Sequence, residues 1–171
     1  MITPAYVRGF SAYNSEMNRR IYAAAARLSD AERRQDRGAF FGSLQGTLNH
    51  LLWADQTWMS RFAGWPRLAK PGTESARLYD DFAEMQAKRV EVDAGIEAWA
   101  ASLTDDGLAG DLTWFSGMIQ SEMTAPKSVA LIHMFNHQTH HRGQAHALLT
   151  AAGQDTGGTD IGFILPLSVW S

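Results

Sequence analysis

The residues best suited to chemistry are histidines, and four of the six in the chain lie between His133 and His141. No proline interrupts this segment, while Pro126 precedes it and Gly153 follows it, where a helix would begin and end. On such a helix His137 and His141 are four residues apart, share one face and fall within the apolar stripe. The spacing therefore predicts two imidazoles that point into the interior of a helical bundle.

A buried imidazole needs hydrogen-bond partners for its ring nitrogens or a metal ion for one of them. Two histidines at positions i and i+4 of a helix can both reach one ion at about 2.0–2.1 Å. A third ligand would come from another segment, and His50 is the only histidine outside the last helix. Periodicity alone does not place His50 at the centre of the core, since it lies to one side of the apolar positions around it. The residues thus predict a metal site on His137 and His141, with His50 as the candidate third ligand.

Other polar residues near these positions have several interpretations. Asp55 falls on an apolar line, so its carboxylate needs a donor: Arg142, a ligand histidine or a capping amide. Arg142 and Gln144 either help to structure the site or pair with acids elsewhere, and neither is interpreted as catalytic. The remaining histidines are expected to be surface or hydrogen-bonding residues: His133, His140 and His146. His140 is also a candidate to orient a ligand histidine.

The composition limits the classes of function. The chain has 171 residues, 45% hydrophobic and 19% charged, with a formal net charge of −3. That length suits one domain over residues 1–171 with a single core, and the charge argues against nucleic acid as a partner. There is no cysteine, so thiolate ligands and a cysteine nucleophile are excluded. Any thiol in the chemistry must be an external cosubstrate.

The N-terminal residues lack a basic stretch followed by an apolar core. No apolar run approaches the roughly 20 residues needed to span a bilayer. We therefore expect no membrane partner and a cytoplasmic location.

Four segments carry apolar residues at spacings of three and four, which predicts helices over about 4–28, 43–63, 75–102 and 126–152. Thr3 and Ser43 are suitable caps for the first two. The charged positions of the third helix, Arg89 and Asp93 among them, are expected to face solvent. The loop over 66–72 is long enough to carry the chain back across an end of the bundle, so the second and third helices are expected to run parallel.

Two further segments are predicted outside the helices. Residues 111–124 place Ser-Gly between two short β-prone runs, which favours a hairpin that leads into the last helix. The tail contains an apolar run at 161–167 and is expected to pack over the bundle or a partner. A small bundle is not expected to bury all of its large apolar residues, which include Trp65, Trp170 and this run. Apolar surface left exposed in this way favours a homodimer.

Two motifs resemble the DinB family of damage-inducible bacterial proteins: residues 136–144 in the last helix and 47–55 in the second. The likeness covers nearly the whole chain and is weaker after Gly153. It implies an all-α four-helix bundle in up-down-down-up order, with a small β-hairpin before the last long helix. It also implies a stress-associated homodimer and a divalent metal held by His50, His137 and His141. Three imidazoles suit nickel or zinc best.

Two functions are compatible with these features. The first is a metalloenzyme that, like relatives in the family, uses a low-molecular-weight thiol for transfer to an electrophile or for isomerisation. The second is a non-enzymatic homodimer whose structural metal supports binding of a small ligand or partner. Gln138 follows His137 where a zinc peptidase helix carries a glutamate base, and Asp55 and Glu122 are the nearest candidate carboxylates. Such a site suits a nucleophile that arrives nearly ionised, as a thiol does.

Overall fold

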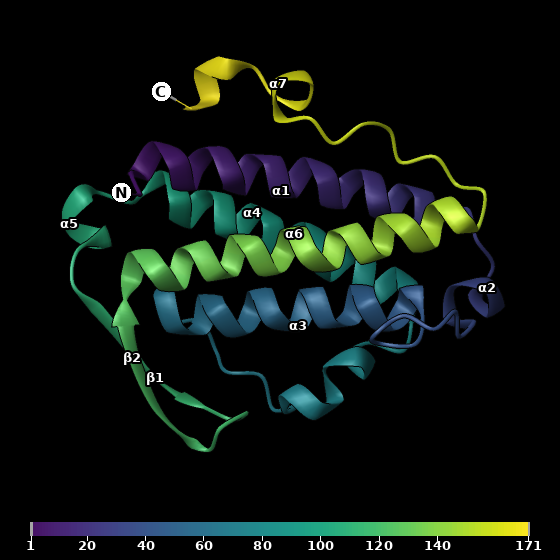
Figure 1. Cartoon of the computed structure of the whole chain (residues 1–171), viewed down its shortest axis with the longest axis horizontal. Helices are drawn as coiled ribbons and strands as arrows, with labels where there is room; N and C mark the ends of the chain where they lie inside the picture. The colour runs from purple at the N-terminus through teal and green to yellow at the C-terminus, as the bar shows by residue number, and fades with distance from the viewer. Residues whose placement is uncertain (1, 171) are drawn as a thin grey trace.

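Four long helices lie side by side in the computed structural model, which describes residues 2–170 (Figure 1). They are α1 (Pro4–Ala25), α3 (Leu44–Phe62), α4 (Phe82–Ala101) and α6 (Lys127–Ala151). Helices α1 and α6 run in one direction, and α3 and α4 run in the other (Figure 1). The helical bundle is therefore as expected, and its second and third long helices are parallel.

Shorter elements connect the long helices. They are α2 (Asp30–Arg34), η1 (Gly72–Arg77), α5 (Asp105–Leu108), β1 (Asp111–Ser116), β2 (Ser121–Pro126), α7 (Ile161–Ile164) and η2 (Leu167–Trp170). Strand β1 pairs antiparallel with β2, from Asp111 opposite Pro126 to Ser116 opposite Ser121, which confirms the hairpin. Among residues 2–170, no helix combines the length and apolarity required to cross a bilayer.

The helix ends follow local hydrogen bonding. The side chains of Thr3 and Ser43 accept hydrogen bonds from the first turns of α1 and α3, as expected of caps. The third long helix begins at Phe82 rather than near residue 75, because Asn49 binds both backbone groups of Tyr79. Its amide oxygen accepts from the Tyr79 N–H at 2.7 Å, and its amide nitrogen donates to the Tyr79 carbonyl at 3.0 Å. These bonds hold residue 79 against α3 and separate η1 from α4.

The core lies between the four long helices, and each contributes side chains with almost no exposed surface. They include Ile21, Leu48, Leu52, Met59, Met85, Leu131, Met134 and Leu149. Each such side chain stabilises the fold by roughly 1.5–3 kcal/mol through removal of apolar surface from water. Helix α3 packs against both α6 and α4, so residues of α3 are brought beside the last helix.

A buried set of polar residues, here called the ion-pair network, corrects two expectations. Arg89 and Asp93 are only 3% and 8% exposed, so the interpretation of both as solvent-facing is wrong. Arg89 Nη1 donates to Asp55 Oδ2 at 2.6 Å, and Arg89 Nη2 lies 2.7 Å from Asp93 Oδ1. Gln138 also donates to Asp55 and Asn18 donates to Asp93, which completes the network. The donors to Asp55 are thus not Arg142, a ligand histidine or a capping amide.

The tail packs along α1, which is one of the two alternatives expected for it, the bundle or a partner. The Trp170 ring lies directly over Gly9, where a larger side chain would collide with it, and 5.3 Å from the Phe10 ring. Trp65 packs in the same way on α4, where a Cβ at Gly95 would lie 2.8 Å from the indole. Both tryptophans pack against helices of their own chain, so neither is evidence for a dimer. The homodimer stays a prediction.

Candidate metal centre

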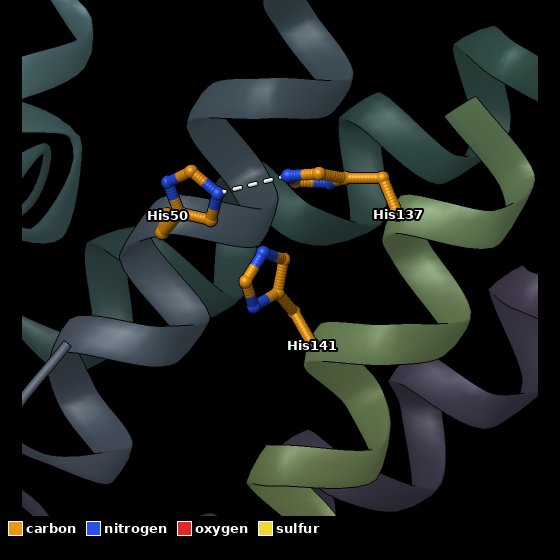
Figure 2. A group of neighbouring side chains, drawn as sticks. All are labelled: His50, His137 and His141. Atoms are coloured by element: carbon orange, nitrogen blue, oxygen red, sulfur yellow. Dashed lines mark hydrogen bonds between the residues drawn. The ribbon is translucent and has the colours of Figure 1, made fainter. Parts of the chain in front are cut away.

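Three histidines from two helices converge on one point, and we call them the histidine cluster. His50 comes from α3, and His137 and His141 come from successive turns of α6 (Figure 2). One nitrogen of each ring can be chosen so that all three lie within 4.8 Å of one another, close enough to hold a metal ion. The packing of α3 on α6 therefore places His50 opposite the i,i+4 pair, which periodicity alone could not decide.

Hydrogen bonds to the outer ring nitrogens determine which nitrogens face inward. His141 Nδ1 lies 2.7 Å from Gln144 Oε1, which can only accept, so Nδ1 carries the proton and Nε2 keeps its lone pair. His50 Nδ1 lies 2.9 Å from the Ser75 hydroxyl, which leaves its Nε2 directed at His137. An anchored Nδ1 is the usual way in which proteins orient a metal-binding imidazole.

The donor set fits a divalent ion. His50 Nε2 and His137 Nε2 are 3.0 Å apart (Figure 2). Two nitrogens that bind one tetrahedral ion at about 2.0–2.1 Å lie roughly 3.3 Å apart, so little movement is needed to accommodate it. Three nitrogen donors without sulfur match ions of the nickel and zinc type.

The electrostatic environment keeps these rings neutral. Burial lowers the pKa of His50 to about 3 and the pKa of His137 to about 4, and the neighbouring imidazoles add to both effects. Burial also lowers the pKa of His141, against the opposing effect of its hydrogen bond to Gln144. At neutral pH all three rings are therefore in the form that donates a lone pair to a metal.

Aromatic side chains border the cluster. The Phe41 ring stacks on His50 at 3.9 Å between centroids and lies 5.3 Å from His141. Trp53 stacks on His50 at 6.2 Å. These rings restrict the approach of water and lower the local dielectric. Sequence analysis did not identify Phe41, because it lies in the connection before α3 and no periodic pattern includes it.

No carboxylate belongs to the cluster among the residues that the structure describes. Asp55 is 2% exposed and bound to Arg89 and Gln138, so it does not serve as a base for a molecule at the histidines. Glu122 is exposed on the hairpin. Neither of the candidate carboxylates lies where proton abstraction at the cluster would need it.

The other histidines remain outside the cluster. His133 and His140 are exposed, and His146 Nδ1 is 2.6 Å from the Thr156 hydroxyl, as expected of surface or hydrogen-bonding residues. Gln144 joins His140 to the cluster, since its amide nitrogen lies 3.3 Å from His140 Nε2 while its oxygen binds His141. Arg142 is buried, with its guanidinium 5.5 Å from the Tyr13 ring.

Comparison with known proteins gives a consistent result. The model of the DinB family matches residues 1–166. A crystal structure of a DinB-like protein from Bacillus cereus ATCC 10987 aligns with a TM-score of 0.65 and 22% sequence identity. The alignment covers 85% of this chain and 90% of that one, and at this identity it shows a shared fold. No curated protein matches this chain significantly.

Proposed function

The chain belongs to the DinB family, and from this premise we propose that it is a metalloenzyme with a divalent ion held by His50, His137 and His141. The ion would serve the reaction of an external low-molecular-weight thiol with an electrophile, by transfer or by thiol-assisted isomerisation. The observation that carries the proposal is the convergence of three neutral imidazoles from two helices, with no adjacent carboxylate among residues 2–170.

Nickel and zinc are the proposed ions, because both accept three imidazole ligands. When bound, such an ion supplies a Lewis acid whose 2+ charge is not neutralised by its ligands, which favours an anionic nucleophile. Ser75 and Gln144 hold the rings of His50 and His141 in orientation through Nδ1. Phe41 and Trp53 limit the access of water.

The absence of a base beside the cluster favours a thiol over water as the nucleophile. Gln138 follows His137 in the chain, but its side chain turns away and binds Asp55 and Asn14 in the interior. Water on a catalytic zinc ion keeps a pKa of about 7, whereas an ordinary thiol, with a pKa of about 8.5 when free, is deprotonated outright when it binds the ion. A thiol therefore needs much less help from the protein to reach its reactive form.

A second candidate is a non-enzymatic homodimer with a structural metal. The hairpin favours it, because Phe115, Met118 and Ile119 near its tip are 54%, 94% and 57% exposed. Apolar side chains gathered at one exposed tip are typical of a contact surface. Light scattering tests this candidate, since a monomer mass at micromolar concentration contradicts it.

Element analysis tests the metal site. We expect about one nickel or zinc ion per chain in purified protein, little metal in His137→Ala, and full metal content in the matched control His133→Ala. If folded His137→Ala keeps its full metal content, the assignment of the ligands is wrong.

Cobalt substitution tests the role of the thiol. Cobalt-loaded protein is titrated with a panel of low-molecular-weight thiols while the thiolate-to-cobalt charge-transfer band is followed. A band in the wild type that His50→Ala and His141→Ala abolish supports the metalloenzyme. If no thiol produces a band although the protein holds its cobalt, the thiol reaction is wrong and the structural role remains.

A further inference from the structure

A half-buried arginine without an acidic partner lies near the histidine cluster. The guanidinium carbon of Arg61 is 4.3 Å from the centre of the Trp58 ring and 5.5 Å from that of Trp114. None of the ion pairs found among residues 2–170 includes Arg61. Burial lowers the pKa of Arg61 to about 10, and repulsion from Arg67 contributes. A cation that has lost part of its hydration and has no counterion is a favourable place for an anion to bind.

The position of Arg61 connects it to the cluster. It lies eleven residues after His50 on α3, which is close to three helical turns and therefore the same face. Its guanidinium lies over Trp58, three residues earlier, so the side chain leans back toward His50. The Trp58 ring is 5.2 Å from His133, and His133 is 5.8 Å from His137. A continuous row of rings thus joins Arg61 to the candidate metal centre.

The hairpin completes this arrangement. Trp114 comes from β1, and its ring packs edge-on against Trp58 at 5.6 Å between centroids. The guanidinium lies over both indole rings, and a guanidinium held over aromatic rings still has N–H groups to donate to an anion. Those edges have the fork geometry that matches a carboxylate or phosphate. Residues from α3, β1 and α6 therefore meet at one cationic position.

Charges around this position do not oppose an anion. In register, Glu122 pairs with Phe115, the neighbour of Trp114, and alternate residues of a strand point to opposite faces. Glu122 thus lies on the face of the hairpin away from Trp114. Asp55 is buried and paired with Arg89. The charged group that acts on the pKa of Arg61 is the cation of Arg67, although the chain as a whole has a net charge of −3.

We propose that Arg61, between Trp58 and Trp114, binds an anionic group of the thiol whose sulfur reacts at the histidine cluster. This inference rests on the proposed function and specifies its substrate class: a thiol that carries a carboxylate or phosphate on the order of 10 Å from its sulfur. The distance follows from the rise of about 16 Å over eleven helical residues, shortened because the long Arg61 side chain leans back farther than the His50 side chain does.

A series of thiols of increasing length tests the assignment. Cobalt-loaded protein is titrated with ω-mercaptoalkanoates from mercaptopropionate to mercaptoundecanoate, with the uncharged amide of each, and with the matching phosphonates. We expect amides and short acids to bind alike. Once the chain is long enough to reach Arg61, the carboxylate or the phosphonate should bind about tenfold more tightly than the amide, because a charge-assisted hydrogen bond forms.

Variants of Arg61 distinguish a role in binding the anion from a role in holding the hairpin in place. In Arg61→Met the preference for the long anion should fall to within about twofold, with the affinity for the amide unchanged. Arg61→Lys should keep part of the preference, because it retains the charge but not the fork. Arg67→Met is the matched control and should keep the full preference. If Arg61→Met weakens acid and amide equally, or Arg67→Met has the same effect, Arg61 only holds the hairpin and the proposal is wrong.

The test also distinguishes failure of this site from failure of the metalloenzyme. If thiols bind but acid and amide bind equally at every length, the anion site is wrong and the proposed function stands. If no thiol binds, octanoate and octanamide are added to wild-type protein while the NMR signal of the Arg61 Nε–H group, assigned by its loss in Arg61→Lys, is followed. A shift with octanoate alone then supports the anion site without the thiol reaction, and no shift contradicts both.

Discussion

The ion-pair network and the histidine cluster lie in the same bundle and share α3 and α6, to which the network adds residues of α1 and α4. Their polar groups have different partners. In the network, the carboxylates of Asp55 and Asp93 are bound by Arg89, by Gln138 and by Asn18, all within the protein. In the cluster, the protein fixes the outer nitrogens of His50 and His141 and directs inner nitrogens at a common point. Buried polar groups must be satisfied in either case.

This difference indicates which of the two regions depends on a bound ligand for its contribution to stability. Gln138 and His137 are neighbours in the chain, yet Gln138 turns to the network while His137 faces the cluster. The helical rotation between consecutive residues separates the two environments. The network therefore contributes to folding in the absence of any ligand, whereas the cluster contributes most when an ion is bound. The predictions that follow test this distinction.

The largest effect is expected from Arg89→Met. It leaves two carboxylates buried without their cation, and breaking a buried pair in this way costs about 3–5 kcal/mol of the free energy of unfolding. Urea unfolding followed by circular dichroism measures it. Lys88→Met is the control, since its pair with Glu91 is on the surface and is worth about 0–1 kcal/mol. A loss below about 1 kcal/mol for Arg89→Met would mean that the network is not needed for stability.

The next effect separates the cluster from the network. At a free metal concentration one hundred times the dissociation constant, binding to the folded state adds about 2.7 kcal/mol to the free energy of unfolding. His137→Ala should lose this increment while its metal-free stability stays close to that of the wild type. Unfolding with nickel or zinc and with chelator measures both values, and His133→Ala serves as the control. A His137→Ala protein that is still stabilised by the ion contradicts the ligand assignment.

The two regions also differ in how well the sequence predicts them. The spacing of His137 and His141 identifies a shared helical face directly, and packing then supplies His50 from a motif that periodicity left undecided. Arg89 and Asp93 are misread because an i,i+4 pair of opposite charges is typical of a helix surface. Asp55 on an apolar line does indicate that its carboxylate needs a donor, but the sequence does not reveal that Arg89 and Gln138 supply it.

Contacts between segments far apart in the chain are even harder to predict from the sequence. Arg61 and Trp114 meet because the hairpin lies against α3, and neither residue belongs to a pattern that predicts the other. The same holds for Trp170 over Gly9, where a small residue in α1 matters only because the tail returns to it. Periodicity predicts elements and faces, whereas the pairing of faces depends on the packing of the whole chain.

A smaller effect is expected from the residue that orients a ligand. Gln144→Leu removes the acceptor for His141 Nδ1 but keeps a side chain of similar size. Loss of such a partner weakens metal binding by about 10- to 100-fold, and we expect the lower end because His50 keeps its contact with Ser75. Competition with a chromophoric chelator measures the affinity. His140→Ala is the control, and an equal loss in that variant would mean that Gln144 acts through His140.

A last effect distinguishes the two regions by the sign of their response to pH, measured with chelator present. Burial lowers the pKa of His50 to about 3 and of His137 to about 4, from 6.5. Below pH 6.5 the unfolded chain therefore binds protons that the folded chain does not, and the free energy of unfolding falls as pH decreases toward 4.

Burial raises the pKa of Asp93 from 3.8 to about 6, which acts in the opposite direction over an overlapping window. The double variant His50→Gln, His137→Gln lacks the response of these two rings, so its stability relative to the wild type should rise as pH decreases from 6.5 to 4. All other groups cancel in that comparison, and a difference independent of pH would show that the two imidazoles are not held neutral by the fold.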